Sequence, residues 1–381
     1  MRSFLKTTGP VLAALAALVS FSSAPRAEGL FPPGGLPGKS PSTVYTMTNA
    51  VNGNAILAYR QAENGTLTPL GTFATGGLGS GGGLGNAGGV VLSPDQHWLF
   101  AVNAGSNEIS VFAIGEEGGL RLASKVASGG GLPVSVAVDD DLVYVLNAGS
   151  DLIAGFRLTA DGRLEAIPGS LRSLGATGTN PAEIAFNPDG QSLIITEKAT
   201  NKLAVFALNR DGLADNTPRL VATPGSTPFG FSFSHRKTLL VSEAGGGTNG
   251  SSLSSYHILR DGLPKVVDGA VRTLQSAACW VVVTPDGRFA YTSNAASQSI
   301  SGFRVSPSGD LTLLNPNGVS ATSSGNGNPI DSVISRDGRF LYVLNAGRDT
   351  ISVFGIGHDG DLSTVGTVQN LPTSANGLAF R

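Results

Sequence analysis

The sequence predicts an all-β fold, a seven-bladed β-propeller with four antiparallel strands in each blade. Two observations support it: a strand–turn–strand unit recurs along the chain, and Asp-Gly or related turn dipeptides bound each copy. The clearest copy, Ser335–Leu362, reads SRDGRFLYVLNAGRDTISVFGIGHDGDL. Alternating apolar and polar residues between such turns are typical of β-hairpins.

Seven copies of this unit follow one another, with a spacing of about fifty residues that fits one propeller blade. The copies are Val44–Leu67, Ser93–Leu120, Asp139–Leu164, Asn187–Leu213, Ser234–Leu263, Thr284–Leu311 and Ser335–Leu362. Their equivalent turn positions hold Asn49, Asn103, Asn147, Glu197, Glu243, Asn294 and Asn345. We interpret the repeated Asn as a turn residue that tolerates left-handed backbone angles.

Further strands complete each blade, and the two chain ends complete the ring. A short apolar strand precedes each Pro-Asp-Gly-type turn, and a fourth strand follows each Asp-Gly-type turn. The predicted inner strands include Val134–Val138, Ile184–Phe186, Phe229–Phe233, Val281–Val283 and Ser332–Ile334. The first copy lacks an inner strand, and Ala375–Arg381 forms a lone one. The C-terminal strand should therefore join the N-terminal blade and remove the open edges.

Composition agrees with a turn-rich β protein. The chain has 381 residues, of which 53 are Gly, and charged residues make up only 14%. Gly this frequent without a three-residue period indicates many turns. No helical periodicity is evident beyond the first thirty residues.

The N-terminus has the pattern of a secretory signal peptide, residues 1–27. Arg2 and Lys6 precede an apolar run, Val11–Phe21, and small residues follow up to Ala27. A Pro/Gly-rich leader, 28–43, then precedes the propeller domain, 44–381. We expect a periplasmic or secreted protein with no membrane span after cleavage. A lone cysteine, Cys279, cannot form a disulfide within the chain.

Charge and motifs exclude several function classes. Cleavage would remove three basic residues and take the net charge from −2 to −5, with no basic stripe for nucleic acid. The chain lacks HExxH, GxSxG and CxxC patterns. We expect no cofactor, no metal and a monomer. His97, His235 and His358 fall in turns of the predicted bottom face, and His257 lies on an outer strand.

A low-complexity segment, Gly76–Gly89, separates the first two blades and reads GGLGSGGGLGNAGG. It could be a phosphate-binding loop or a flexible connection between blades. A phosphate-binding loop needs a following helix, and none is predicted, so we interpret the segment as a flexible loop.

Candidate site residues gather on the top face, where the inner strands begin and propellers bind ligands. Glu183, Trp280 and Asp331 begin inner strands, and Glu183 and Asp331 should face the central axis. Glu197, Lys198, Glu243 and Arg348 lie in or beside turns on the same face. The catalytic candidates are Glu243, Glu183 and Asp331, and the ligand-binding candidates are Trp280, Arg348, Glu197 and Lys198. Such carboxylates could instead be solvated or accept backbone N–H groups.

The stretches TPDGRFAYTSN and SRDGRFLYVLNAGRDTISVF resemble the lactonase family of seven-bladed propellers, and the turns resemble YVTN-type repeats. The family includes 6-phosphogluconolactonase-like proteins and fungal 3-carboxymuconate cyclases. The resemblance spans Val44 to Arg381 and implies a lactone hydrolase or cycloisomerase.

Four top-face features of the family have counterparts in this chain. A Pro-His-x-His stretch corresponds to Asn180-Pro181-Ala182-Glu183, and a Pro-Arg-His stretch corresponds to Pro228-Phe229-Gly230. An Asn-Glu corresponds to Ser242-Glu243, and an Asn-Arg-Gly corresponds to Asn294-Ala295-Ala296. The Glu is present, whereas the His and both Arg are replaced. Two hypotheses follow: an exported lactonase-like enzyme, or a non-catalytic propeller that binds a small lactone-like or sugar-like molecule, a polymer or a protein at its top face.

Overall fold

The computed structural model describes residues 41–234, 237–323 and 327–381. The predicted signal peptide and nearly all of the leader lie outside these residues, so the export prediction stays a prediction. Within the three ranges, no helix has the length and apolar character that a membrane crossing requires.

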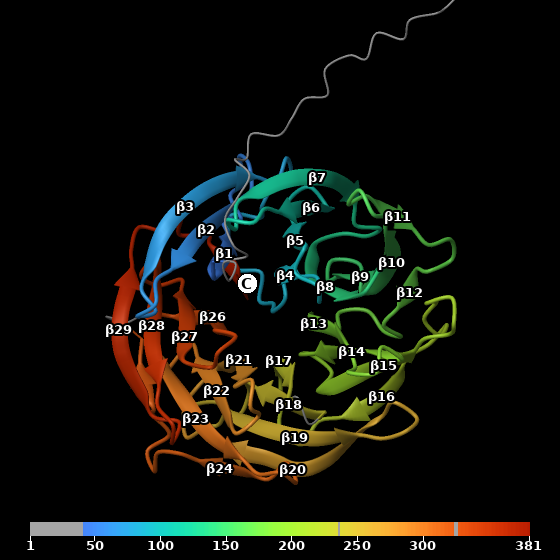
Figure 1. Ribbon diagram of the computed structural model, residues 1–381. Coiled ribbons are helices and arrows are strands. Elements are labelled where there is room, and N and C mark those ends of the chain that lie inside the picture. The colour runs from blue at the N-terminus through green and yellow to red at the C-terminus, as the bar shows by residue number, and fades with distance from the viewer. Residues whose placement is uncertain (1–40, 235–236, 324–326) are drawn as a thin grey trace, which may run out of the picture. The chain divides into compact units, whose positions relative to one another are not determined.

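Seven antiparallel sheets stand in a ring, each with one strand at the centre and one at the rim (Figure 1). This confirms the predicted propeller. Blade 1 contains β30 (Asn376–Phe380), β1 (Thr43–Met47), β2 (Ala55–Gln61) and β3 (Leu67–Ala74). Blade 2 contains β4 (Val90–Leu92), β5 (Trp98–Asn103), β6 (Glu108–Ile114) and β7 (Leu120–Ala127). Blade 3 contains β8 (Pro133–Asp139), β9 (Leu142–Asn147), β10 (Leu152–Leu158), β11 (Leu164–Ala166) and β12 (Arg172–Ser173).

The other four blades repeat the arrangement from inside to outside. Blade 4 contains β13 (Pro181–Phe186), β14 (Ser192–Glu197), β15 (Lys202–Ala207) and β16 (Arg219–Ala222). Blade 5 contains β17 (Pro228–Phe233), β18 (Thr238–Glu243), β19 (Ser252–Ile258) and β20 (Pro264–Arg272). Blade 6 contains β21 (Ala278–Val283), β22 (Phe289–Asn294), β23 (Ser299–Val305), β24 (Leu311–Leu313) and β25 (Ala321–Thr322). Blade 7 contains β26 (Pro329–Ile334), β27 (Phe340–Asn345), β28 (Thr350–Ile356) and β29 (Leu362–Val368).

The C-terminal strand closes the ring, as predicted. β30 pairs with β1 in antiparallel register, with Ala379 opposite Tyr45. Thr43 and Arg381 exchange two backbone hydrogen bonds, of 3.2 and 2.9 Å. The first and last segments of the propeller thus share one sheet, and blade 1 has a paired inner strand.

The turns between the third and fourth strands of the blades lie on the bottom face and share one backbone feature. The glycine in each has a positive φ between 81° and 96°, except Gly212 at 77°. This conformation is costly for a residue with a Cβ, which explains why the position holds glycine in all seven copies. These glycines are Gly65, Gly118, Gly162, Gly212, Gly262, Gly309 and Gly360.

Buried tyrosines on the second strands connect four blades to the next blade. The Tyr144 hydroxyl of blade 3 donates to the Gly212 carbonyl of blade 4 at 2.7 Å. Tyr45, Tyr291 and Tyr342 make the same bond to Gly118, Gly360 and Gly65. Ser255 of blade 5 bonds the Gly309 carbonyl in a similar way. The turns of one blade are therefore held by the interior of its neighbour.

The repeated Asn has a different role from the one that the sequence suggested. Asn103 and Asn345 end strands and are fully buried. Their side-chain amides donate across the sheet to Ser110 and Ser352. The left-handed residue in these turns stands four positions later, as at Asn107 and Asp349. Of the seven turn positions, only Asn49 has a positive φ, so the Asn chiefly joins two strands.

Loss of a hydrogen bond between a tyrosine and the next blade should destabilise the ring. Tyr144→Phe removes the hydrogen bond to Gly212 and the acceptor for the Ala214 N–H, and it leaves buried polar groups unpaired. We expect a loss of about 1–3 kcal/mol in the free energy of unfolding, measured by urea denaturation. Tyr256→Phe is the matched control, because its buried hydroxyl has no hydrogen-bond partner among the described residues. An equal loss of unfolding free energy in both variants would contradict a stabilising role for the hydrogen bond to Gly212.

Candidate functional site

The central channel contains a cavity of about 200 Å³ with two carboxylates in its wall. Glu183 comes from β13 of blade 4, and Asp331 comes from β26 of blade 7. Both therefore lie on inner strands that converge on the axis. The cavity is lined by Ala87, Gly88, Val90, Val91, Glu183, Gly230, Phe231, Ser232, Trp280, Val281, Val282, Asp331, Ser332 and Leu378.

Glu183 presents part of its side chain to the cavity. Its Oε2 atom accepts a hydrogen bond of 2.6 Å from the Phe231 N–H of the neighbouring inner strand. Protein surrounds the carboxyl group, and this burial raises its pKa to about 8, with the negative charge of Asp331 adding to the rise. The side chain can therefore exchange a proton near neutral pH.

Asp331 is held more firmly. Its two oxygens accept hydrogen bonds from the Ser332 N–H at 2.7 Å and the Leu378 N–H at 3.0 Å. Only 8% of the residue is exposed. Burial raises its pKa to about 7, while the two N–H groups oppose the rise. The two hydrogen bonds thus fix the orientation of Asp331, and its negative charge, once the group is ionised, raises the pKa of Glu183.

An apolar cluster fills the top of the channel above the carboxylates. It contains Ala87, Ala182, Phe229, Cys279 and Trp280. The rings of Phe229 and Trp280 lie 4.9 Å apart and tilt at 58°. Ala182 and Phe229 occupy the positions where the resemblance leads one to expect a His and an Arg. Apolar packing has therefore replaced polar chemistry at these two positions.

The Gly-rich segment covers this cluster and makes hydrogen bonds to blades 1, 2, 3, 4 and 6. The Trp280 Nε1–H donates to the Asn86 carbonyl at 2.8 Å, and the Ala87 N–H donates to the Ala182 carbonyl at 3.1 Å. The Lys198 ammonium donates to the Gly85 carbonyl. Farther from the axis, the Gly79 N–H bonds the Ala50 carbonyl at 2.8 Å. The segment joins β3 to β4, as expected, but it is not the flexible loop that we predicted.

The lower half of the channel is more open than the upper half. Six inner strands, β4, β8, β13, β17, β21 and β26, each end in two half-buried residues, whereas each begins with a buried residue. These strands run from the top face to the bottom face. The half-buried ends of these strands therefore lie toward the bottom, and they include Phe186 and Phe233.

Glu243 does not line the channel cavity. It is 1% exposed, and it ends β18 at the position that Asn occupies in other blades. Its carboxylate accepts hydrogen bonds from the Gly225 N–H, the Ser252 hydroxyl and the Ser254 hydroxyl at 2.5–2.8 Å. Burial raises its pKa. The geometry makes Glu243 the counterpart of the strand-joining Asn.

The other predicted residues lie apart from the cavity, except Trp280. Glu197 is buried and accepts a hydrogen bond from Thr200. Arg348 is exposed in a turn of blade 7. Lys198 lies 4.7 Å above the Phe229 ring, and burial lowers its pKa to about 8. Trp280 lines the cavity while its indole N–H holds the Gly-rich segment.

Neither thiol nor imidazole chemistry is evident at the cavity. Cys279 is a buried free thiol whose pKa burial raises to about 12, so it stays protonated. His97 pairs with Asp95 in a bottom-face turn, at 2.9 Å. No group of three His, Cys, Asp or Glu side chains in the described ranges could hold a metal ion.

Two features of the site were beyond the reach of sequence reasoning. Ser232 adds a half-buried hydroxyl to the cavity, yet a Ser inside an apolar strand carries no special signal. The Gly-rich segment looked unstructured because its composition hides the backbone contacts that hold it.

The profile of the family described as "Lactonase, 7-bladed beta-propeller" matches residues 39–173 and 261–374, more than half of the chain. The chain therefore belongs to the lactonase family. The matched residues include Trp280 and Asp331, whereas Glu183 and Glu243 fall in the unmatched stretch between them. No curated protein matches the chain.

Solved structures share the fold at low sequence identity. A candidate 6-phosphogluconolactonase from Bacteroides uniformis is 22% identical, with a TM-score of 0.71 over 89% of this chain and 99% of that one. The periplasmic gluconolactonase of Pseudomonas aeruginosa is 21% identical, with a TM-score of 0.71 over 89% and 98%. A Lactobacillus plantarum protein is 20% identical, with a TM-score of 0.73 over 90% and 99%.

The contacts of the Gly-rich segment predict a position-dependent response to added methyl groups. A Cβ at Gly79 would lie 2.0 Å from the Asn49 carbonyl carbon, whereas one at Gly82 would meet nothing within 4 Å. Gly79→Ala should therefore displace the segment and speed amide hydrogen exchange over residues 75–89. Gly82→Ala is the control and should match the unaltered protein. Unchanged exchange in Gly79→Ala would show that the segment is not held as described.

The raised pKa of Glu183 predicts a pH-dependent stability. The folded protein keeps the proton up to pH about 8, whereas the unfolded chain releases it near the ordinary value of 4.5. The stabilising contribution is thus complete below pH 4.5 and is lost as pH rises toward 8. Relative to the unaltered protein, Glu183→Gln should gain thermal stability between pH 5 and 8. The same substitution at the exposed Glu165 should not, and parallel curves for all three proteins would contradict the assignment.

Proposed function

We propose that the chain is a lactonase-like hydrolase or isomerase that acts on a small lactone or sugar-like molecule in the central channel. The observation that carries this proposal is the pairing of Glu183 and Asp331 in one cavity, both with pKa values near neutral. Family membership and the fold shared with a gluconolactonase support the substrate class.

In a hydrolysis, Glu183 is the group that touches the reacting atoms. Its ionised carboxylate would take a proton from water as the water oxygen adds to the lactone carbonyl carbon. It would return that proton to the ring oxygen as the ring C–O bond breaks, which gives a hydroxy acid. The Ser232 hydroxyl, which lines the cavity, would donate a hydrogen bond to the carbonyl oxygen.

Asp331 would act through Glu183 as a positioning residue. Its charge helps to keep the pKa of Glu183 high, which strengthens the carboxylate as a base. Because the Gly-rich segment covers the top of the channel, we infer that substrate enters from the bottom face. This departs from the top-face entry that we expected from the sequence.

A second function, ligand binding without catalysis, also has an observation in its favour. Ala182 and Phe229 stand where the family has a His and an Arg, and both belong to the buried apolar cluster. The cavity lining contains no Arg, Lys or His among the described residues, so a carboxylate or phosphate on the substrate would lack a partner there.

Export remains part of the proposal. The N-terminal pattern favours it, and the related Pseudomonas aeruginosa protein is named as periplasmic. A monomer that binds neither nucleic acid nor a cofactor is the form that we propose for the mature chain.

Turnover of a lactone panel by purified variants tests the proposed chemistry. Glu183→Gln should lower kcat by about 100-fold or more, as expected for loss of a general base. For the unaltered enzyme, kcat/KM should rise with pH up to about 8. Asp331→Asn should move that rise to lower pH, because it removes a charge that raises the pKa of Glu183.

Glu243→Gln is the comparison for a buried carboxylate outside the cavity. It should lower stability through its three hydrogen bonds while kcat per folded molecule stays unchanged. Full turnover by Glu183→Gln would refute the mechanism. Binding of lactones by the unaltered protein without any turnover would refute the enzyme and support the second function.

A further inference from the structure

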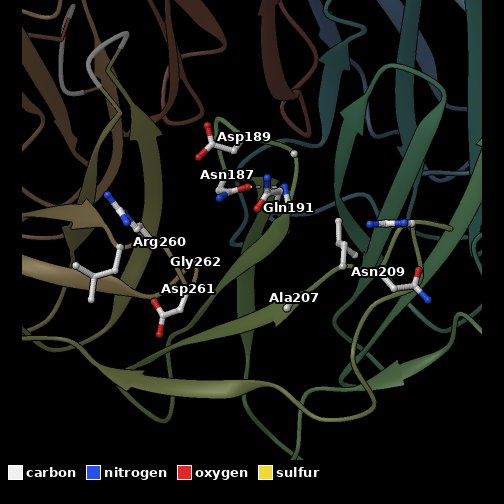
Figure 2. A pocket seen from close by; sticks show the side chains of 12 residues that line it. Asn187, Asp189, Gln191, Ala207, Asn209, Arg260, Asp261 and Gly262 are labelled. Carbon is white, nitrogen blue, oxygen red and sulfur yellow. Dashed lines mark hydrogen bonds between the residues drawn. The ribbon is translucent and has the colours of Figure 1, made fainter.

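The bottom face carries a groove of about 380 Å³ between blades 4 and 5, away from the channel. Figure 2 shows Arg260 on one side of it, Asn209 on the other, and Asn187 and Gln191 between them. Three turns build the groove: one between β13 and β14, one after β15, and one between β19 and β20. None of its residues takes part in the proposed channel chemistry.

Asn187 has a buried amide that its turn does not require. The residue is 5% exposed, and its Oδ1 accepts hydrogen bonds from the Gln191 N–H at 2.9 Å and the Ser192 N–H at 3.1 Å. Its Nδ2 makes no hydrogen bond within the described part of the chain. In other blades a hydroxyl takes the place of this amide oxygen, from Ser93, Ser234, Thr284 and Ser335.

Asn209 repeats this arrangement across the groove. Its Oδ1 accepts hydrogen bonds from the Asp211 N–H at 3.0 Å and the Leu213 N–H at 2.9 Å. Its Nδ2 likewise has no acceptor among the described residues. In blade 3 the equivalent Thr159 closes the turn through its hydroxyl oxygen. In both asparagines the amide oxygen therefore accepts hydrogen bonds within the fold, whereas the Nδ2 donor can reach a ligand in the groove.

Two arginines add positive charge. Arg210 and Arg260 stand at the second position of matching turns, where the other blades have Glu63, Glu116, Ala160, Pro307 and His358. Neither arginine has an ion pair or hydrogen bond within the described ranges. By contrast, the nearby carboxylates Asp189 and Asp261 are already paired, with Lys237 and Arg219.

Guanidinium groups without a partner in the described part of the chain distinguish this groove from two similar ones. The groove between blades 6 and 7 contains His358 and Arg288, and that arginine is ion-paired with Asp286. A corresponding groove between blades 2 and 3 is lined by Asp95, Asp140 and Asp141 and by no Arg or Lys. The lactonase profile also leaves residues 174–260 unmatched, which include most of this lining. The groove is thus a feature of this chain where it departs from its family.

We propose that the groove between blades 4 and 5 binds a small molecule that carries an oxyanion, a phosphate or a carboxylate. Two guanidinium groups supply charge and paired N–H donors, which match the oxygens of such groups. The Asn187 and Asn209 amides add neutral donors, and the volume lies in the range of small-molecule sites. This site is independent of the channel function.

Calorimetric titration with inorganic phosphate, gluconate and 6-phosphogluconate tests the proposal. The unaltered protein should bind at least one of them, and the phosphate and gluconate arms separate the two oxyanions. Arg210→Gln and Arg260→Gln should each weaken binding about tenfold, since a hydrogen bond to a charged group contributes about 1.5–3 kcal/mol. Asn187→Ser should weaken it less while keeping the turn closed by a hydroxyl.

Two controls separate a built site from general attraction. Arg163→Gln removes an exposed, ion-paired arginine from the matching turn of blade 3 and should bind as the unaltered protein does. Glu183→Gln should also bind normally, whether or not lactones are turned over. Absence of binding to all three probes, or equal weakening by Arg163→Gln and Arg260→Gln, would overturn the proposal.

Discussion

The hydrogen bond between a buried tyrosine and the glycine carbonyl of the next blade is the interaction on which this ring depends. Each such bond joins the interior of one sheet to a turn that only glycine can adopt without strain. Tyr342 with Gly65 makes the bond where the last blade meets the first. The same turns lie on the bottom face, and the bond from Tyr144 to Gly212 holds the turn that contains Arg210.

Ring closure creates the conditions for chemistry in the channel. Glu183 and Asp331 are far apart in sequence, yet their strands converge on one axis once β30 completes blade 1. Burial there disfavours the charged forms, and two carboxyl groups in one cavity disfavour them further. The Gly-rich segment extends this burial by covering the top of the channel through backbone contacts. The resulting site is closed at the top and lined by half-buried residues toward the bottom.

The repeat patterns predicted the fold well because the strands and turns of each blade can be recognised within its own stretch of sequence. Strand alternation, the Asp-Gly turns and the lone C-terminal strand were enough to predict seven blades and their closure. The same patterns misjudged the repeated Asn, because a side chain that joins two strands and one that bends a turn look alike in sequence. Glu243 shows the difficulty for function: the sequence suggested it as a catalytic residue, yet three hydrogen bonds tie it to the sheet.

The sequence by itself determined the strand order, the turn positions and the placement of Glu183 and Asp331 at the starts of inner strands, because these follow from local alternation and spacing. Only the tertiary structure decided which carboxylates share a cavity, that the Gly-rich segment covers the channel, and which amides and arginines keep unused donors. Those properties arise from contacts between blades about fifty residues or more apart, and such contacts have no local signature. Burial and hydrogen-bond partners decide whether a polar residue has a structural role or a chemical one.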